Sequence, residues 1–257
     1  SSLIKDLELL EMPKLAFKFF LWDALIPLCA IDARPDRVFS FKLKWTDHQI
    51  KLMLDKRLAA YSQQAVTDSF KLFQEKKNLG RIVLFSEFSP RDSIRICNRI
   101  LSEQYKHDFT SPIFQSSIVN NAIDEFSKEK IKEILPDLKS INYLIKTNTA
   151  SFTNGQLVND KVAGTAAAIR NITRPWASHN ISKKIGLVTR KGKKAVNEYA
   201  FIDIRAARVA CSSMSLDNFI NNKVRRCSGE NCSEIYYRNF DNAIYTCPEC
   251  GTIGDPH

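Results

Sequence analysis

Four cysteines near the C-terminus constrain the fold more than any other feature of the sequence. Cys227 and Cys232 form one close pair, Cys247 and Cys250 form a second, and fourteen residues separate the two pairs. Two cysteine pairs on tight turns can place four thiolates around one tetrahedral ion, which suits zinc. Because four protein ligands leave no open position for a substrate, we expect a structural Zn²⁺ in a small β zinc ribbon. Redox cysteines and an iron–sulfur centre are the alternatives.

The remaining cysteines, Cys29, Cys97 and Cys211, lie in apolar surroundings and are expected to be buried. The first residues lack the charged-then-apolar order of a secretory signal, so disulfides are not expected. The most apolar stretch, residues 15–31, is interrupted by Lys18 and by Pro27, which argues against a membrane span. We therefore expect a cytoplasmic protein without a membrane partner.

The positive charge of the chain is concentrated in one segment. Residues 151–226 carry 14 Lys and Arg against 4 Asp and Glu, or +10, whereas residues 1–150 carry +4 and residues 227–257 carry −4. Such a concentration is typical of a segment that binds a phosphate backbone. A basic face that only contacts solvent is the alternative.

The basic segment has the pattern of three short helices followed by a hairpin. Leu138, Ile141 and Leu144 mark the first helix, Thr153 begins the second, and Gly164 precedes the third. Residues 185–189 and 195–202 then read as two strands around a glycine-containing basic tip. This order is that of a winged helix, for which we expect residues 136–222 as the domain and 223–257 as the zinc ribbon.

The predicted winged helix carries basic and amide side chains in positions suited to nucleic acid. A helix with Arg and Asn can contact base edges in a groove, and a lysine-rich wing can lie along phosphates. DNA or RNA is thus the expected partner, and a winged helix that binds protein or joins domains is the alternative. The candidate nucleic-acid-binding residues are Arg170, Asn171, Arg174, Lys183, Lys184, Arg190, Lys191, Lys193 and Lys194.

Two details of this segment are also predicted. Pro175 lacks an amide hydrogen, so the third helix should end or kink near Thr173. Residues 204–219 read as one closing helix that leads to the cysteines.

Residues 1–135 read as strands followed by helices. Apolar runs predict strands over 15–22 and 38–45. Thr46 is a plausible cap of the first helix. A later helix opens at Ser89, with Pro90 at its first position and Asp92 completing a capping box. With the winged helix and the ribbon, the expected fold class is α/β to α+β and mainly helical.

This N-terminal part resembles the back half of a P-loop ATPase of the AAA+, STAND or KAP kind. The resemblance is carried by the strand 15–22 followed by Asp23, by the segments 34–37, 41–45 and 53–58, and by the helix opening that contains Arg91. It implies a partial ATPase core with a helical lid, in which Asp23 is a sensor candidate and Arg91 a lid arginine near the γ-phosphate. A helix cap for Asp23 and a surface ion pair for Arg91 are the structural alternatives.

The family's phosphate loop and Walker B acid are absent from this chain. By itself the chain should not hydrolyse ATP, and ATP with Mg²⁺ is expected only in a longer parent protein. The resemblance implies a C-terminal portion that couples nucleotide state to DNA or RNA contact, with other subunits or the N-terminal ATPase half as partners. The alternative is a protein-binding regulatory or oligomerisation module of an ATPase defence complex.

Overall fold

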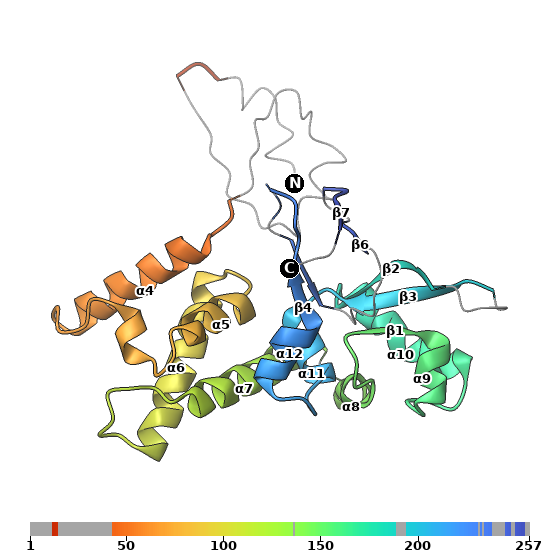
Figure 1. The fold of residues 1–257 in the computed structure, drawn as a ribbon, viewed down its shortest axis with the longest axis horizontal. Helices are drawn as coiled ribbons and strands as arrows, with labels where there is room; N and C mark the ends of the chain where they lie inside the picture. The colour runs from red at the N-terminus through yellow and green to blue at the C-terminus, as the bar shows by residue number, and fades with distance from the viewer. Residues whose placement is uncertain are drawn as a thin grey trace. The chain divides into compact units, whose positions relative to one another are not determined.

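A computed structural model of the 257-residue chain describes residues 12–14, 43–135, 137–188, 194–230, 232, 234–237, 245–247 and 250–254 (Figure 1). The chain divides into a unit of residues 1–44 and a unit of residues 45–257. The strand predicted over 15–22, Asp23 and Cys29 lie outside the described residues, and residues 43–45 form no strand. The partial ATPase core expected there stays a prediction.

Side-chain caps begin two helices of the second unit where the sequence predicts them. Helix α4 (Asp47–Tyr61) begins after Thr46, whose hydroxyl accepts from the Gln49 amide while the Gln49 side chain accepts from the Thr46 amide. Helix α6 (Pro90–His107) begins after Ser89, which accepts from the amide of Asp92. Each cap pairs amides that the helix itself leaves unsatisfied.

The capping box predicted at α6 is wrong in one of its two hydrogen bonds: the Asp92 side chain does not accept from the Ser89 amide. The Ser89 amide donates to the Ser86 carbonyl at 3.0 Å, and the buried Asp92 carboxylate pairs instead with Lys130 at 3.2 Å. Lys130 belongs to α7 (Ser116–Ile134), which packs against α6. A buried carboxylate is compensated better by a cation than by an amide that already has a partner.

The segment predicted as a winged helix contains the three predicted helices and the two predicted strands in the predicted order, with one additional short strand. Strands β1 and β2 both pair with β3 in antiparallel register. The three-residue β1 was not predicted, because so short a run carries no alternation. This segment contains α8 (Leu138–Lys146), β1 (Ser151–Thr153), α9 (Asn154–Asn159), α10 (Ala166–Ser178), β2 (Ser182–Val188) and β3 (Val196–Phe201).

An end of α10 near Thr173 is wrong, since the helix runs to Ser178 with Pro175 inside it, whereas a kink there stays a prediction. Trp176, one residue beyond the proline, is fully buried against Phe152 and Phe201, with ring centroids 5.9 and 5.7 Å away. Burial of a large aromatic side chain offsets the hydrogen bond that the proline removes. The helix ends one turn later, where the His179 amide donates to the Pro175 carbonyl.

The single closing helix predicted over 204–219 is also wrong, because the structure has two helices there. Helix α11 (Ile204–Ala210) and helix α12 (Leu216–Lys223) are separated by a turn, and Ser215 caps the second by accepting from the Asn218 amide. Arg208 donates to the carbonyls of Cys211 and Met214 in that turn. Carbonyls left open by the end of α11 are thus satisfied by a side chain.

Helix α11 is buried along its whole length although it contains two arginines. Arg205 contacts Asp203 and Glu87, each at 2.6 Å. Arg208 forms two hydrogen bonds with the carboxylate of Asp124 in α7, at 2.7 and 2.8 Å. Both guanidinium groups are therefore compensated inside the protein.

The cysteine-containing segment is joined to the sheet at one point. Strand β4 (Val224–Arg226) pairs with β5 (Ile235–Tyr237), and Tyr237 pairs with Phe201 of β3. Beyond them, β6 (Tyr245–Thr246) pairs with β7 (Ile253–Gly254). The described part of the chain is thus a mixture of helices and small antiparallel sheets, which is an α+β fold.

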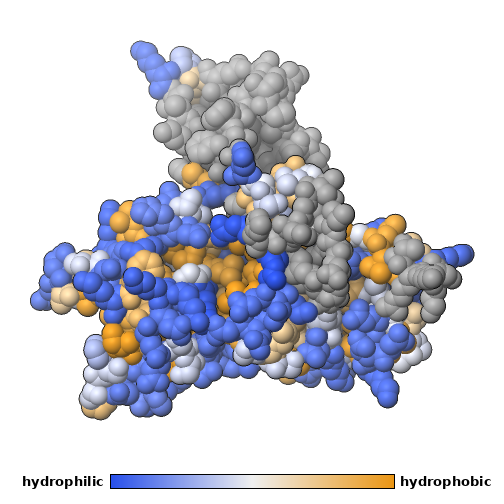
Figure 2. Space-filling view, viewed as in Figure 1, coloured by the Kyte–Doolittle hydropathy of each residue, from blue (hydrophilic) through white to orange (hydrophobic). Residues whose placement is uncertain are grey.

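One large apolar core connects the segments that we predicted as separate domains. It runs from Ile82 of α5 (Lys77–Phe85) to Tyr237 of β5 and so crosses residues 135 and 222. The predicted domain limits stay predictions. In the view of Figure 2, hydrophilic residues cover most of the described surface, and apolar colour is visible mainly in a depression near its middle.

Removal of a buried guanidinium should cost more stability than removal of one at the surface. Arg208→Ala leaves Asp124 without its partner and should lower the free energy of unfolding by about 3 kcal/mol. Arg99→Ala removes a more exposed pair with Glu129 and should cost less than about 1 kcal/mol. Urea denaturation of both variants measures the difference, and equal losses would contradict it.

Candidate metal centre and basic surface

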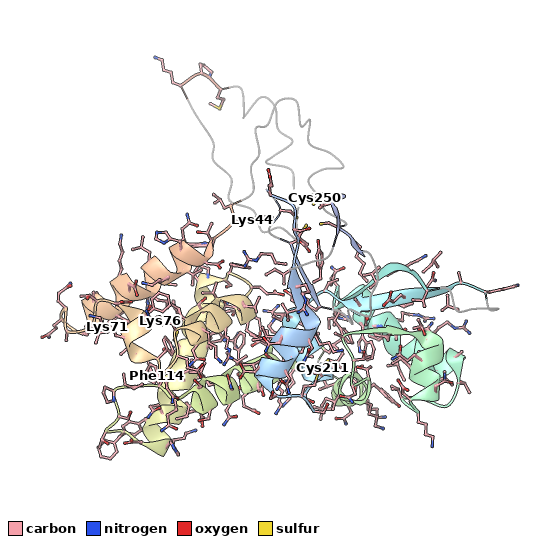
Figure 3. All side chains as sticks on the ribbon, viewed as in Figure 1. Lys44, Lys71, Lys76, Phe114, Cys211 and Cys250 are labelled. Carbon is pink, nitrogen blue, oxygen red and sulfur yellow. The ribbon has the colours of Figure 1, made fainter. Side chains whose placement is uncertain are left out.

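The four C-terminal cysteines come together in the structure. Cys227 directly follows β4, Cys247 directly follows β6, and Cys250 lies three residues before β7 (Figure 3). Their sulfur atoms, with that of Cys232, all lie within 4.8 Å of one another. The two hairpins therefore gather residues from both pairs at one point.

The distances between the sulfurs fit a metal site and exclude disulfides. Sγ of Cys227 is 3.6 Å from Sγ of Cys250, and Sγ of Cys232 is 3.7 Å from Sγ of Cys247. A disulfide would need about 2 Å. Four sulfurs around one ion at bonds of about 2.3 Å lie about 3.8 Å apart, as the edges of a tetrahedron. The arrangement can hold a tetrahedral metal ion without rebuilding.

Two tight turns give the sulfurs their positions. The Cys232 amide donates to the Gly229 carbonyl at 3.0 Å, and the Gly251 amide donates to the Cys247 carbonyl at 2.9 Å. Gly251 has a φ of 71°, which side chains rarely tolerate. The Gly229 amide donates to Cys227 Sγ at 3.3 Å. Such an N–H to sulfur bond stabilises a thiolate ligand.

Gly229 was missed by the sequence reasoning. A Cβ atom at residue 229 would lie 2.9 Å from Thr252 Oγ1 and 3.1 Å from Cys250 Sγ. Any larger residue would push the two turns apart. The available signal was a glycine two residues after the first cysteine of a pair.

The electrostatics of the site also favour a bound cation. The side-chain hydroxyl and the backbone amide of Thr252 lower the pKa of Cys250. At Cys232, a backbone hydrogen bond with Glu234 lowers the pKa, but burial and the three neighbouring sulfurs raise it to about 12. Four thiolates so close together repel one another, and a divalent ion would remove that repulsion.

The other two described cysteines are not part of this group. Cys211 is fully buried in the core and Cys97 is half-buried. Burial raises the pKa of Cys97 to about 12 and that of Cys211 to about 11, so both are neutral thiols. The expectation of buried cysteines therefore holds fully for Cys211 and in part for Cys97.

The candidate residues of α10 form one exposed stripe. Arg170, Asn171 and Arg174 are exposed, whereas Ile169 and Trp176 on the opposite side are buried. Their spacing of one and four residues places all three on the same face of the helix. Neither arginine forms an ion pair within the part of the chain that the structure describes.

The hairpin carries further exposed charge. Lys183 and Lys184 of β2 and Lys194 before β3 are exposed, and none of them pairs with a described carboxylate. The tip residues Arg190, Lys191 and Lys193 lie outside the described residues. The described candidate residues of α10 and of the hairpin are therefore exposed, and no described carboxylate neutralises them.

The structure describes one of the two residues proposed to contact a nucleotide. Asp23 lies outside the described residues, and Arg91 is exposed at the start of α6. Arg91 has no ion pair among the described residues, so the structural alternative of a surface ion pair gains no support either.

Comparison with known proteins adds no further assignment. A scan against models of protein families finds no match, and a search of curated proteins finds none either. Among the described helices, none combines the length and apolar character needed to cross a membrane.

The cysteine group should bind one metal ion per chain. The double variant Cys247→Ser, Cys250→Ser removes two of four sulfur ligands and should lose the ion, as measured by elemental analysis of the purified protein. The matched control Cys97→Ala removes a thiol outside the group and should keep it. An intact protein that carries no metal after purification in metal-containing medium would contradict the assignment.

Proposed function

We propose that this chain binds DNA or RNA through a winged helix formed by α8 to β3, and that the four cysteines hold a structural Zn²⁺. The observation that carries the first part is the exposed stripe of Arg170, Asn171 and Arg174 beside a basic hairpin. The observation that carries the second is the set of sulfur distances near 3.7 Å.

The order and pairing of the elements support the winged-helix interpretation. Helix, strand, two helices and a hairpin follow one another, and β3 lies between β1 and β2 in an antiparallel arrangement. In such a domain the third helix enters a groove and the hairpin, or wing, contacts the backbone. Here these roles would fall to α10 and to the hairpin of β2 and β3, and the candidate basic residues described on these elements have no described carboxylate partner.

The chemistry of the exposed residues fits contact with nucleic acid. Arg170 and Arg174 can donate to guanine edges or phosphates, and Asn171 can pair with adenine. Lys183 and Lys184 on the hairpin can attract phosphates, because the attraction between an ammonium group and a phosphate needs no exact geometry. The overall excess of +10 adds attraction at longer range.

Zinc is favoured over other ions because all four candidate ligands are cysteine sulfurs that lie within 4.8 Å of one another. With its coordination filled, the ion has no position for a substrate and acts by holding two hairpins together. Because Tyr237 of β5 pairs with Phe201 of β3, the ion would also anchor the C-terminal segment to the sheet that carries the wing. Elemental analysis separates zinc from the iron–sulfur alternative.

A protein-binding role is the second candidate and has one observation in its favour. Leu187 and Val196 on the hairpin are 62% and 44% exposed. Exposed apolar residues near a basic tip are compatible with a protein partner. The coupling to a P-loop ATPase, which rests on resemblance alone, stays a prediction, because no family model matches the chain.

Salt dependence of binding tests the nucleic-acid proposal. We expect the chain to bind labelled duplex DNA or RNA in fluorescence anisotropy, with the logarithm of the association constant falling by about 0.9 per contacted phosphate for each tenfold rise in salt. Arg170→Glu with Arg174→Glu should abolish binding at moderate salt. Lys183→Gln with Lys184→Gln should weaken binding to all sequences and reduce the salt slope by about 2.

The matched control places the same change of net charge elsewhere. Lys56→Glu with Lys71→Glu alters two exposed lysines of α4 and of η2 (Ser69–Leu72), and should leave binding nearly unchanged. Equal losses in the control and in the α10 variant would mean that only net charge matters. Absence of binding to any nucleic acid at low salt would favour the protein-binding candidate.

A further inference from the structure

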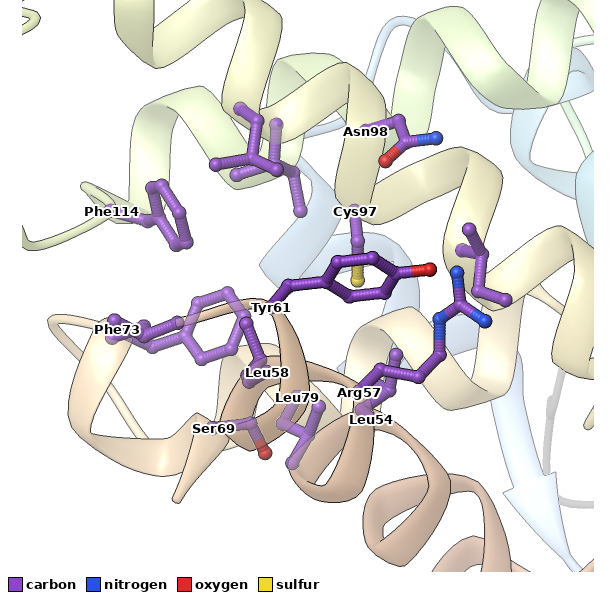
Figure 4. Close-up of a pocket in the computed structure, with 14 residues that line it drawn as sticks. Leu54, Arg57, Leu58, Tyr61, Ser69, Phe73, Leu79, Cys97, Asn98 and Phe114 are labelled. Atoms are coloured by element: carbon purple, nitrogen blue, oxygen red, sulfur yellow. The ribbon is translucent and has the colours of Figure 1, made fainter. Parts of the chain in front are cut away.

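A largely apolar cavity of about 390 Å³ lies among α4, η2, α5 and α6 (Figure 4). None of the four metal-site cysteines and no residue of the basic hairpin is among its described lining residues. Its size is in the range of cavities that bind small molecules. Its walls come from four separate elements and are mainly aliphatic or phenyl, including Leu54, Leu58, Leu72, Leu79, Ile94 and Phe114. Nothing in the proposed nucleic-acid or zinc functions uses this space.

Among the described residues that line the cavity, Arg57 is the one cation, and no described carboxylate pairs with it. Arg57 is exposed, and its described contact is with the ring of Tyr61, 5.4 Å from the guanidinium carbon. The neighbouring acid on α4, Asp55, is already paired with Lys51 at 2.6 Å. In Figure 4 the Tyr61 ring lies across the cavity, with its hydroxyl toward Arg57.

The amide of Asn98, an exposed residue that lines the cavity, makes no hydrogen bond with a described residue. Cys97 extends from α6 into the same space as a neutral thiol (Figure 4).

We propose that this cavity binds an alkyl carboxylate of medium length, with its chain between the aliphatic walls and its carboxylate on Arg57. A planar guanidinium pairs with a carboxylate through two parallel hydrogen bonds. The single cation matches a monoanion rather than a more highly charged phosphate. The apolar lining supplies the larger share of the binding free energy by removing the chain from water.

Decanoate, used below the concentration at which it forms micelles, is the probe for the full-length chain. We expect saturable binding of one decanoate per chain in isothermal titration calorimetry and a rise in melting temperature with its concentration. Decanol, which keeps the chain but lacks the charge, should bind about tenfold more weakly. Decyltrimethylammonium should not bind measurably, and binding equal to that of decanoate would show general adsorption and overturn the proposal.

Two variants on α4 separate the ionic contact from the fold. Arg57→Gln should weaken decanoate binding about tenfold and leave decanol binding unchanged. Lys56→Gln, the matched control on the neighbouring exposed residue, should change neither by more than about twofold. Both positions are exposed, so both variants should fold, and equal decanoate affinity in the wild type and in Arg57→Gln would remove Arg57 from the site.

A third variant tests the location. Leu58→Trp should fill the cavity and abolish decanoate binding while the unliganded melting temperature is kept. Decanoate binding by Leu58→Trp with the affinity of the wild type would place the ligand elsewhere and overturn the proposal.

Discussion

The compensation of two buried arginines in α11 is the interaction on which the rest of the structure depends. Arg205 and Arg208 are 6% and 4% exposed, and each meets carboxylates within 2.8 Å. Asp203 directly precedes α11, but the other two carboxylates come from elsewhere in the fold: Glu87 from the turn between α5 and α6, and Asp124 from α7. A charge without a partner at such a site would be very costly. The helices before residue 135 and the sheet after it must therefore fold against each other, which explains why one apolar core spans both.

The pairing of Arg205 and Arg208 with carboxylates also lowers the positive charge that residues 151–226 can offer to a ligand. The excess of +10 over residues 151–226 includes Arg205 and Arg208, which are buried and paired and cannot attract a ligand. The exposed charge of this segment includes Arg170, Arg174 and Lys184 on α10 and the hairpin, none of which has a described carboxylate partner. Basic residues of one sequence segment thus divide into a structural set and a surface set. The proposed interface depends on the surface set alone.

Local chemistry was readable from the sequence, and tertiary contacts were not. The caps at Thr46 and Ser89 and the cysteine group follow from short-range rules, because each needs only residues close in sequence or a known ligand spacing. The passage of α10 through Pro175 could not be predicted, since it depends on burial of Trp176 against Phe152 and Phe201. The break between α11 and α12 likewise depends on the contacts of Arg208 with turn carbonyls.

The cavity was also beyond the sequence, because its walls come from four elements that only the fold brings together. Helix α6 has little freedom to adapt to a ligand, since Ile96 and Ile100 are buried in the large apolar core together with residues of α7. The opposite wall is held less firmly: α4 joins the protein through a small cluster of Ile50, Leu54, Leu79 and Val83. Fewer buried contacts mean a lower free energy for local opening. A ligand in the cavity would therefore act first on α4, which carries Arg57 and Tyr61, while the frame formed by α6, α7 and α11 stays in place.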